Sequence, residues 1–175
     1  MRATALRLLI LALTLAFGRA LAQESTAPWL WPEDQERILS YARLFQGTPY
    51  RFGAHSFDGE DCSSFIQKTF SVVGIDLPRS SREQARDERF EDVQTSELRA
   101  GDLVFFRNTW RKGVSHVALM LSSTVMIHAS PKLRQITLDE LTSAHPLRKR
   151  VHSVRRWKNV IRDEFVRPRF SWEKF

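Results

Sequence analysis

Residues 61–74 read DCSSFIQKTFSVVG, and this stretch predicts a helix that begins at the single cysteine of the chain. Its apolar residues recur at the spacing of one helical face, which is expected to pack on the core: Cys62, Phe65, Ile66, Phe70 and Val73. Asp61 stands at the N-cap position, where a carboxylate accepts hydrogen bonds from the first helical amides. Gly74 is a typical helix end. The sequence therefore predicts a helix over 62–73 with Cys62 in its first turn.

The segments on either side of this helix indicate the fold class. A helix is predicted over 33–46, and residues 48–59 form a loop. Ser80, with Glu83 three residues later, forms a capping box that opens a third, short helix. Strand patterns then follow at 103–106, 115–121, 125–129 and 151–157. Helices first and strands after predict an α+β fold with N-terminal helices on an antiparallel sheet.

Cys62 has no second cysteine with which to form an intramolecular disulfide. It is therefore an inert buried thiol, an intermolecular bridge or a reactive nucleophile. A free thiol ionises near pKa ~8.5, and the amides at a helix N-terminus stabilise the thiolate and lower that value. Its place in the first turn of a helix favours the reactive interpretation, and Asp61 is expected to turn toward the helix amides as a cap.

Two histidines are candidates for the base that such a nucleophile needs. His116 and His128 are equidistant from Ser122, so a hairpin turning at residues 121–123 places both on one face as cross-strand neighbours. His116 is then expected to take the proton of Cys62, while His128 orients the imidazole of His116.

Two alternative interpretations of these histidines remain open. They can be a hydrogen-bonded pair in the core, without any chemical role. They can also form a zinc site with Cys62 and His55, although the tight ligand spacing of structural zinc sites is missing. His145 and His152 lie in the basic C-terminal part and are expected at the surface.

The N-terminus has the pattern of a secretory signal. Arg2 and Arg7 precede an apolar run over 8–17, which is too short to span a bilayer, and Ala20 and Ala22 suit a cleavage site. We therefore expect a signal peptide over 1–22, export to the periplasm or the exterior, and no membrane span after cleavage. One domain of ordinary size is expected over 23–157, with a leader at 23–32 and an extension at 158–175.

The formal net charge is +7. Outside the predicted signal peptide, most of the excess positive charge lies in a basic segment near the C-terminus. This segment comprises Arg148, Lys149, Arg150, Arg155, Arg156, Lys158 and Arg162. A basic C-terminal face suits an anionic wall polymer or a protein partner, or it is simply solvated. Export argues against nucleic acid.

Six fragments, taken in order, resemble the NlpC-type cell-wall cysteine peptidases, a branch of the papain-like superfamily. They are 47–53 (GTPYRFG), 61–65 (DCSSF), 77–84 (LPRSSREQ), 101–106 (GDLVFF), 115–118 (SHVA) and 127–129 (IHA). The resemblance covers residues from about Tyr41 to Trp157 and implies a papain-like fold. It is specific because all six fragments keep the order and similar gaps.

The resemblance implies roles for eight residues. Cys62 corresponds to the nucleophile, His116 to the base and His128 to the third member of the triad. Tyr50 corresponds to a tyrosine whose hydroxyl helps to stabilise the oxyanion together with the Cys62 amide. Four further residues correspond to positions near the substrate pocket: Asp61, Ser63, Ser80 and Ser81. Capping alone also explains Asp61 and Ser80.

The implied reaction is hydrolysis of a peptidoglycan stem peptide between γ-D-glutamate and diaminopimelate or lysine, through a thioester on Cys62, with no cofactor or metal. Three alternatives remain: a related amidase, an acyltransferase, and a wall-binding or regulatory domain with an occluded site. One departure from the family pattern is His55, which stands where small residues are common and is expected near the cleft.

Overall fold

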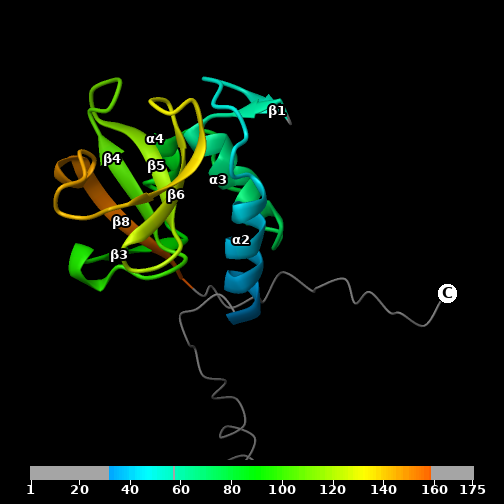
Figure 1. The fold of residues 1–175 in the computed structure, drawn as a ribbon. Coiled ribbons are helices and arrows are strands. Elements are labelled where there is room, and N and C mark those ends of the chain that lie inside the picture. Colours follow the sequence, from blue (N-terminus) through cyan, green and yellow to red (C-terminus); the bar gives the residue numbers. More distant parts are fainter. Residues whose placement is uncertain (1–31, 57, 159–175) are drawn as a thin grey trace, which may run out of the picture. The chain divides into compact units, whose positions relative to one another are not determined.

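The computed structural model describes residues 32–56 and 58–158 (Figure 1). The predicted signal peptide, nearly all of the leader, and the extension after residue 158 lie outside this part. The helices are α2 (Pro32–Leu44), α3 (Cys62–Ser71) and α4 (Ser81–Gln84), with 3-10 turns η1 (Thr95–Glu97) and η2 (Arg148–Arg150). None of these described helices has the length and apolar character needed to cross a membrane.

Six strands form one antiparallel sheet in the order β3-β8-β4-β5-β6-β7, and two short strands form a separate hairpin, β1-β2. The small pair is β1 (His55–Ser56) and β2 (Gly59–Glu60). The large sheet contains β3 (Phe90–Val93), β4 (Leu103–Arg107), β5 (Val114–Met120), β6 (Val125–Ser130), β7 (Gln135–Glu140) and β8 (Val151–Trp157). The predicted α+β class is confirmed, and so are the four predicted strands, within one residue at each end.

The strands that the sequence pattern did not predict are β3 and β7, which form the two edges of the sheet, and the β1-β2 hairpin inside the predicted loop. Edge strands are exposed on more sides, so their apolar residues alternate weakly. In β3 only Phe90 is buried, and in β7 only Ile136 is. Such segments lack the signal on which a sequence-based strand prediction depends.

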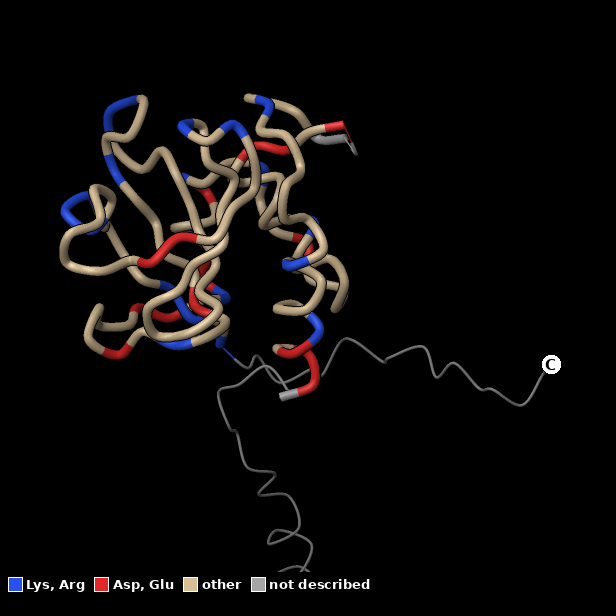
Figure 2. Tube along the Cα trace, in the orientation of Figure 1, with Lys and Arg blue, Asp and Glu red and all other residues tan. Residues whose placement is uncertain are grey.

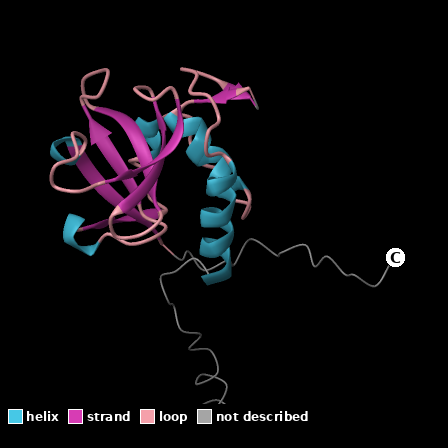
Figure 3. Cartoon of the chain, viewed as in Figure 1, coloured by secondary structure: helices cyan, strands magenta, loops and turns pink. Residues whose placement is uncertain are grey.

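Apolar residues fill both faces of the sheet. On one face α3 packs over the strands and α2 packs against α3, and Phe65, Ile66 and Phe70 of α3 share a core with Val117 and Leu119 (Figures 1 and 3). A second cluster includes Val104, Phe106, Ala118, Met120 and Met126 and is closed by Leu98, Leu141 and Val154. Every residue of β5 is buried as a result. A strand that is covered on both faces holds its side chains in fixed positions.

The local sequence explains where α3 begins and ends. Asp61 caps it as predicted, because Asp61 Oδ1 accepts hydrogen bonds from the amides of Ser63 and Ser64 at 3.1 and 2.8 Å. Ser64 Oγ in turn accepts from the Asp61 amide at 2.9 Å. The helix ends at Ser71, two residues before the predicted end, and Gly74 follows with a φ of +76°. Cys62 is therefore the first residue of a firmly capped helix.

The other two helices also follow their predicted signals. Helix α2 ends at Leu44 rather than at Gln46, because the amides of Phe45 and Gln46 bond three residues back and tighten the last turn. The Ser80–Glu83 capping box is present and opens α4.

The chain between α2 and α3 is attached to the edge of the sheet. The Gly47 amide donates to Ile136 O at 2.8 Å, and the Tyr50 amide donates to Arg134 O at 2.9 Å. Gly59 then passes so close to Arg51 that an added Cβ would lie 2.6 Å from the Arg51 Cγ atom. Glu60, which is fully buried, pairs with Lys68 of α3. These contacts fix the segment that leads into Cys62.

Arginines of β8 are paired with acids rather than exposed. Arg156 contacts both carboxylate oxygens of the buried Asp102, at 2.7 and 2.9 Å, and Arg155 contacts Asp92 at 3.0 Å. Figure 2 shows acidic and basic positions next to one another in this part of the sheet. The prediction of a basic C-terminal face is therefore wrong for these two residues. Within the described residues, the basic residues of that face that remain are Arg148–Arg150, in η2, and the exposed Lys158.

Candidate active site

The Cys62 thiol lies between the first turn of α3 and strand β5. Its side chain is buried, with an exposed fraction of 7%. The backbone amides of Cys62, Ser63 and Val117 all interact with the sulfur. The first two belong to the helix N-terminus, and the third follows His116 in β5. The nucleophile predicted from one element therefore lies against the strand that carries the predicted base.

The environment of the thiol favours its protonated form. Burial, followed by the negative charge of Asp61, outweighs the three amides and raises the pKa of Cys62 to about 12. This direction is opposite to the one expected from the helix end alone. The helix amides do act on the sulfur, but loss of contact with water is the larger effect.

His116 and His128 are both buried and contact each other. Nε2 of His116 lies 2.8 Å from Nδ1 of His128, and the exposed fractions of the two residues are 2% and 3%. Burial holds the pKa of His116 well below its usual value, and the neighbouring His128, beside which a second positive charge is unfavourable, contributes. His116 is therefore neutral near pH 7 and is able to accept a proton.

The hairpin that carries the two histidines differs from the predicted one. Leu119 pairs with Ile127 and Met120 with Met126, so the turn is centred on Ser123 instead of Ser122. This register moves His128 two positions along its strand relative to His116, from a direct to a diagonal partner. The two side chains stay on the same face because a shift of two residues preserves the alternation.

Asp139 of β7 extends this line of polar groups. Its Oδ2 lies 2.9 Å from Nε2 of His128, and the hydrogen bond from His128 lowers the pKa of the Asp139 carboxyl. Asp139 pairs with Met126 in the β6-β7 ladder, which places it on the His128 face. Sequence reasoning missed Asp139, because β7 itself was not predicted and no motif marks the residue.

The structure brings Cys62, His116 and His128 into one region, but hydrogen bonds do not link all three. Among the described residues there is no hydrogen bond between the Cys62 thiol and the His116 imidazole. The hydrogen bonds run from His116 through His128 to Asp139, and the Val117 amide acts on the thiol by lowering its pKa. No group of three His, Cys, Asp or Glu side chains suited to a metal ion occurs in the described part of the chain. The His55 side chain lies outside the described part, although its backbone belongs to β1.

Tyr50 lies close enough to Cys62 and Asp61 for their charges to act on its hydroxyl. A backbone bridge joins it to Glu60, two residues before Cys62. Burial raises the pKa of Tyr50 to about 12, and the charges of Cys62 and Asp61 contribute. The hydroxyl therefore stays protonated and can donate a hydrogen bond at any physiological pH.

Asp61 and Ser63, both predicted near a substrate pocket, belong to a network centred on Arg79. Arg79 contacts the two carboxylate oxygens of Asp61 at 3.0 and 2.6 Å, and it contacts Ser63 Oγ at 3.0 Å. The hydrogen bond from Arg79 and those from the helix cap outweigh burial and lower the pKa of Asp61. Ser81 is buried, whereas Ser80 is engaged with Glu83 in the capping box. The Asp61 carboxylate is thus fully occupied within the protein.

An exposed pair of aromatic side chains was not predicted from the sequence. Phe52 and Trp110 make an edge-to-face contact, with ring centroids 5.0 Å apart. The Trp110 Nε1–H donates to the carbonyl of Ser115, the residue before His116, at 2.6 Å. The pair joins the loop after Tyr50 to the loop between β4 and β5. Phe52 and Trp110 are far apart in sequence, so no local pattern predicts that they are in contact.

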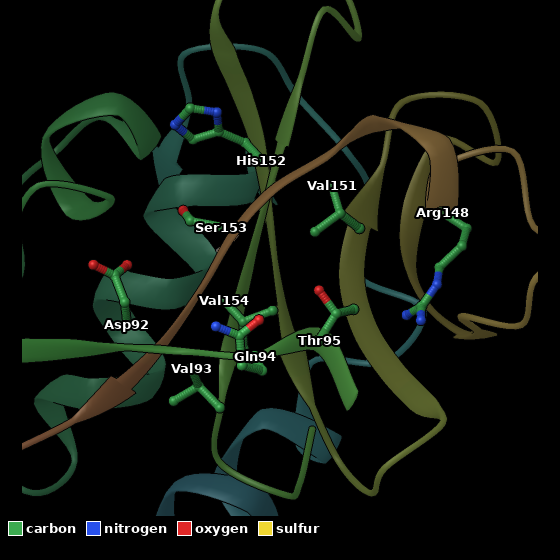
Figure 4. Close-up of a pocket in the computed structure, with 9 residues that line it drawn as sticks. All are labelled: Asp92, Val93, Gln94, Thr95, Arg148, Val151, His152, Ser153 and Val154. Carbon is green, nitrogen blue, oxygen red and sulfur yellow. The ribbon is translucent and has the colours of Figure 1, made fainter. Parts of the chain in front are cut away.

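A shallow groove of about 480 Å³ lies elsewhere, where β3 and β8 meet η1 and η2 (Figure 4). Asp92, Gln94, Thr95, Arg148 and His152 are among the residues that line it. None of the predicted site residues lines it. His152 is exposed, as predicted, whereas His145 is partly buried and lies 3.8 Å from Asp139.

Comparison with known proteins adds independent information. The family model described as NlpC/P60 family matches residues 47–156. The chain is 39% identical over 99 residues to an Escherichia coli protein named murein DD-endopeptidase MepS/murein LD-carboxypeptidase, a match that covers 55% of this chain and 50% of the relative. It is 31% identical over 132 residues to a Bacillus subtilis gamma-D-glutamyl-L-lysine dipeptidyl-peptidase, covering 72% of this chain and 43% of the relative.

A solved structure supports the same comparison. A protein of the NLP/P60 family from Staphylococcus aureus, described as similar to a lipoprotein, superposes with a TM-score of 0.66 at 29% identity. The superposition covers 80% of this chain and 46% of that protein. The chain spans about half the length of the curated relatives it matches.

Proposed function

Because this chain belongs to the NlpC/P60 family, we propose that it is an exported cysteine peptidase that hydrolyses the stem peptides of peptidoglycan. Cys62 is the nucleophile in this proposal, His116 is the base and His128 orients it. The observation that carries the proposal is the position of the Cys62 sulfur, whose ionised form is favoured by the backbone amides of both Ser63 and Val117. It places a thiol at a helix N-terminus beside the strand residue that follows a neutral, buried histidine. The relatives' names support the substrate class.

The two pKa directions define how the reaction begins. The thiol and the imidazole are both neutral at rest, so the site does not hold a preformed thiolate–imidazolium pair. As the sulfur bonds to the scissile carbonyl carbon, the thiol proton passes to His116. The C–N bond then breaks, the amine leaves with that proton, and a thioester remains on Cys62. Water hydrolyses the thioester and regenerates the thiol.

Backbone amides and Tyr50 supply the donors that this step requires. The oxyanion that forms at the scissile carbonyl is stabilised by the Cys62 amide and by the Tyr50 hydroxyl. The raised pKa of Tyr50 keeps that hydroxyl in its donor form. Loss of one such donor typically costs about 10²–10³ in rate. Ser63, Ser80 and Ser81 are proposed to line the substrate pocket, and Asp61 is proposed to act there through Arg79.

The bond we propose is the one between γ-D-glutamate and diaminopimelate or lysine. The name of the Bacillus subtilis relative supports it. A second candidate is cleavage of the cross-link or removal of the terminal D-alanine, because the Escherichia coli relative, with higher identity over a shorter match, is named for those activities. Both candidate reactions use Cys62, His116 and His128. They differ in which bond of the peptide lies next to the Cys62 sulfur.

Export and domain limits belong to the same proposal. Residues 1–22 direct export and are removed, and residues 23–157 form the catalytic unit. An anionic wall polymer or a protein partner would contact Arg148–Arg150, because Arg155 and Arg156 are paired with acids. Sequencing the N-terminus of the secreted protein tests the cleavage site before Gln23.

Digestion of purified muropeptides, followed by mass spectrometry, tests the function and separates the two candidates. A cut after γ-D-glutamate releases a fragment that starts at diaminopimelate. Cleavage of the cross-link converts dimers into monomers, and carboxypeptidase activity removes one alanine. Cys62→Ala is expected to abolish the products, and His152→Gln, at an exposed histidine of β8, is expected to preserve them. The proposal fails if every muropeptide stays intact or if Cys62→Ala remains active.

A further inference from the structure

The carboxylate of Asp139 lies at the end of the line of hydrogen bonds that begins at His116. We propose that Asp139 is a positioning residue: by accepting a hydrogen bond from Nε2 of His128, it fixes the tautomers of both histidines so that Nδ1 of His116 is free of hydrogen. The inference deepens the proposed function and rests on it. Asp139 itself touches neither the thiol nor the peptide in this scheme.

Asp139 has an unambiguous role in this line of hydrogen bonds. An ionised carboxylate can only accept hydrogen bonds, and the lowered pKa of Asp139 keeps it ionised near pH 7. Its Oδ2 lies 2.9 Å from Nε2 of His128. The hydrogen of that contact must therefore sit on Nε2 of His128.

The next contact follows from the first. When His128 is neutral its imidazole carries one hydrogen, so Nδ1 then bears a lone pair and accepts. Its partner at 2.8 Å is Nε2 of His116, which must donate. The single hydrogen of neutral His116 is thereby placed on Nε2. Nδ1 of His116 is left as the basic nitrogen, and it is the one that receives the proton of Cys62.

The reversed arrangement shows why the carboxylate matters. If His128 carried its hydrogen on Nδ1, Nε2 of His116 would have to accept, and the hydrogen of His116 would move to Nδ1. His116 would then have no nitrogen with which to accept the thiol proton. Both arrangements form one hydrogen bond between the rings, so the ring contact alone does not select between them. The selection comes from Asp139.

Other groups around Asp139 do not compete for this role. His145 Nε2 lies 3.8 Å from the same Oδ2, beyond hydrogen-bond distance. His145 Nδ1 accepts a hydrogen bond from the Leu147 amide, so Nε2 of a neutral His145 also carries hydrogen. Lys132 adds a positive charge nearby. His145 and Lys132 therefore favour the ionised form of the Asp139 carboxylate. They do not displace His128 as its hydrogen-bond donor.

The test uses the mature full-length protein and two substitutions. Asp139→Asn replaces a pure acceptor with an amide that can also donate, and Asp139→Glu keeps the carboxylate. Glu140→Gln, at the exposed neighbour on β7, is the matched control for loss of one charge. We expect Asp139→Asn to lower kcat for muropeptide cleavage by about 10- to 100-fold, the effect typical of partners that orient a functional histidine. KM should be nearly unchanged. Asp139→Glu should restore part of kcat, and Glu140→Gln should match the parent protein.

Nitrogen-15 NMR of the histidine rings reads the tautomers directly, independently of activity. In the parent protein we expect hydrogen on Nε2 of both His116 and His128, and in Asp139→Asn we expect a population with hydrogen on Nδ1. The inference is overturned if parent His116 carries hydrogen on Nδ1, if Asp139→Asn leaves the tautomers unchanged, or if it leaves kcat unchanged. If the protein cleaves no muropeptide, the proposed function fails, and the ring spectra still decide the tautomers.

Discussion

Arg79 binds Asp61 through two parallel contacts, from Nη1 to Oδ1 at 3.0 Å and from Nη2 to Oδ2 at 2.6 Å. Asp61 precedes Cys62, and its negative charge raises the pKa of the thiol. Arg79 offsets that charge while the same carboxylate caps α3. The pairing therefore allows an acidic cap next to a residue that must become negative.

The first prediction concerns this offset. Arg79→Gln leaves the Asp61 charge uncompensated, so the thiolate of Cys62 becomes less favourable and its pKa rises further. We expect alkylation of Cys62 by iodoacetamide at pH 8 to slow by roughly tenfold, which corresponds to about one pKa unit. Mass spectrometry of the alkylated protein measures the rate. Arg82→Gln, at an exposed arginine of α4, should leave the rate unchanged.

The second prediction concerns the pH dependence of the thiol. With a Cys62 pKa of about 12, the thiolate fraction should still be rising at pH 10. We expect the alkylation rate to increase roughly tenfold per pH unit between pH 7 and 10. A plateau below pH 8 would instead indicate a stabilised thiolate and would contradict the neutral pair proposed for the resting site.

The third prediction concerns stability in mild acid. The folded protein holds the pKa of His116 well below the 6.5 of a free histidine, so below pH 6.5 the unfolded chain binds a proton that the folded chain does not. The contribution of His116 to the free energy of unfolding is therefore complete above pH 6.5. Below pH 6.5 it falls as pH decreases, by at most about 1.4 kcal/mol per pH unit. Denaturant unfolding at pH 7 and pH 5 measures the loss. His116→Gln should show a smaller loss, and an equal loss in both proteins would assign the effect to other groups.

The fourth prediction concerns the ion pair between Glu60 and Lys68. Glu60 is fully buried, and Lys68 is largely so. Removing one partner leaves a charge in a poorly solvated place, so Glu60→Gln and Lys68→Met should each destabilise the fold by about 3 kcal/mol. The double variant should cost less than the sum of the two single variants. Glu36→Gln, at an exposed acid of α2, provides the control. Additive losses would show that the two side chains do not depend on each other.

The fifth prediction concerns Tyr50. If its hydroxyl donates to the oxyanion, Tyr50→Phe should lower kcat about 100-fold and change KM little, because the interaction forms mainly in the transition state. Steady-state kinetics on one purified muropeptide provide both constants. A raised KM with an unchanged kcat would place Tyr50 in substrate binding instead.

Features fixed by neighbouring residues were predictable from the sequence. The Asp61 cap, the start of α3 at Cys62, the Ser80 capping box and the positions of the four central strands along the chain all depend on short-range patterns. The register of the hairpin was harder to predict. Ser122 and Ser123 are chemically alike, and a turn centred on either residue keeps the two histidines on one face.

Features that depend on three-dimensional packing were not predictable from local pattern. Asp139 reaches His128 only because β7 lies beside β6, and β7 has too little alternation to be recognised. The pKa of Cys62 was expected to fall because the helix end is visible in sequence. The packing that removes the thiol from water is not visible there, and it reverses the direction. The arginines of β8 likewise became partners of Asp92 and Asp102 only once the strands were paired.

The bonds from Gly47 and Tyr50 to β7 have a consequence for association between molecules. An outermost strand with unpaired amides and carbonyls is a template for another chain, and such contacts lead to aggregation. Residues 47–50 occupy the first part of β7 in place of a neighbour, through bonds to Arg134 and Ile136. The same segment ends at Tyr50, and its bonds to the sheet hold the Tyr50 backbone in place. A change that loosens them would therefore weaken the proposed oxyanion donor and, at the same time, open the sheet to intermolecular pairing.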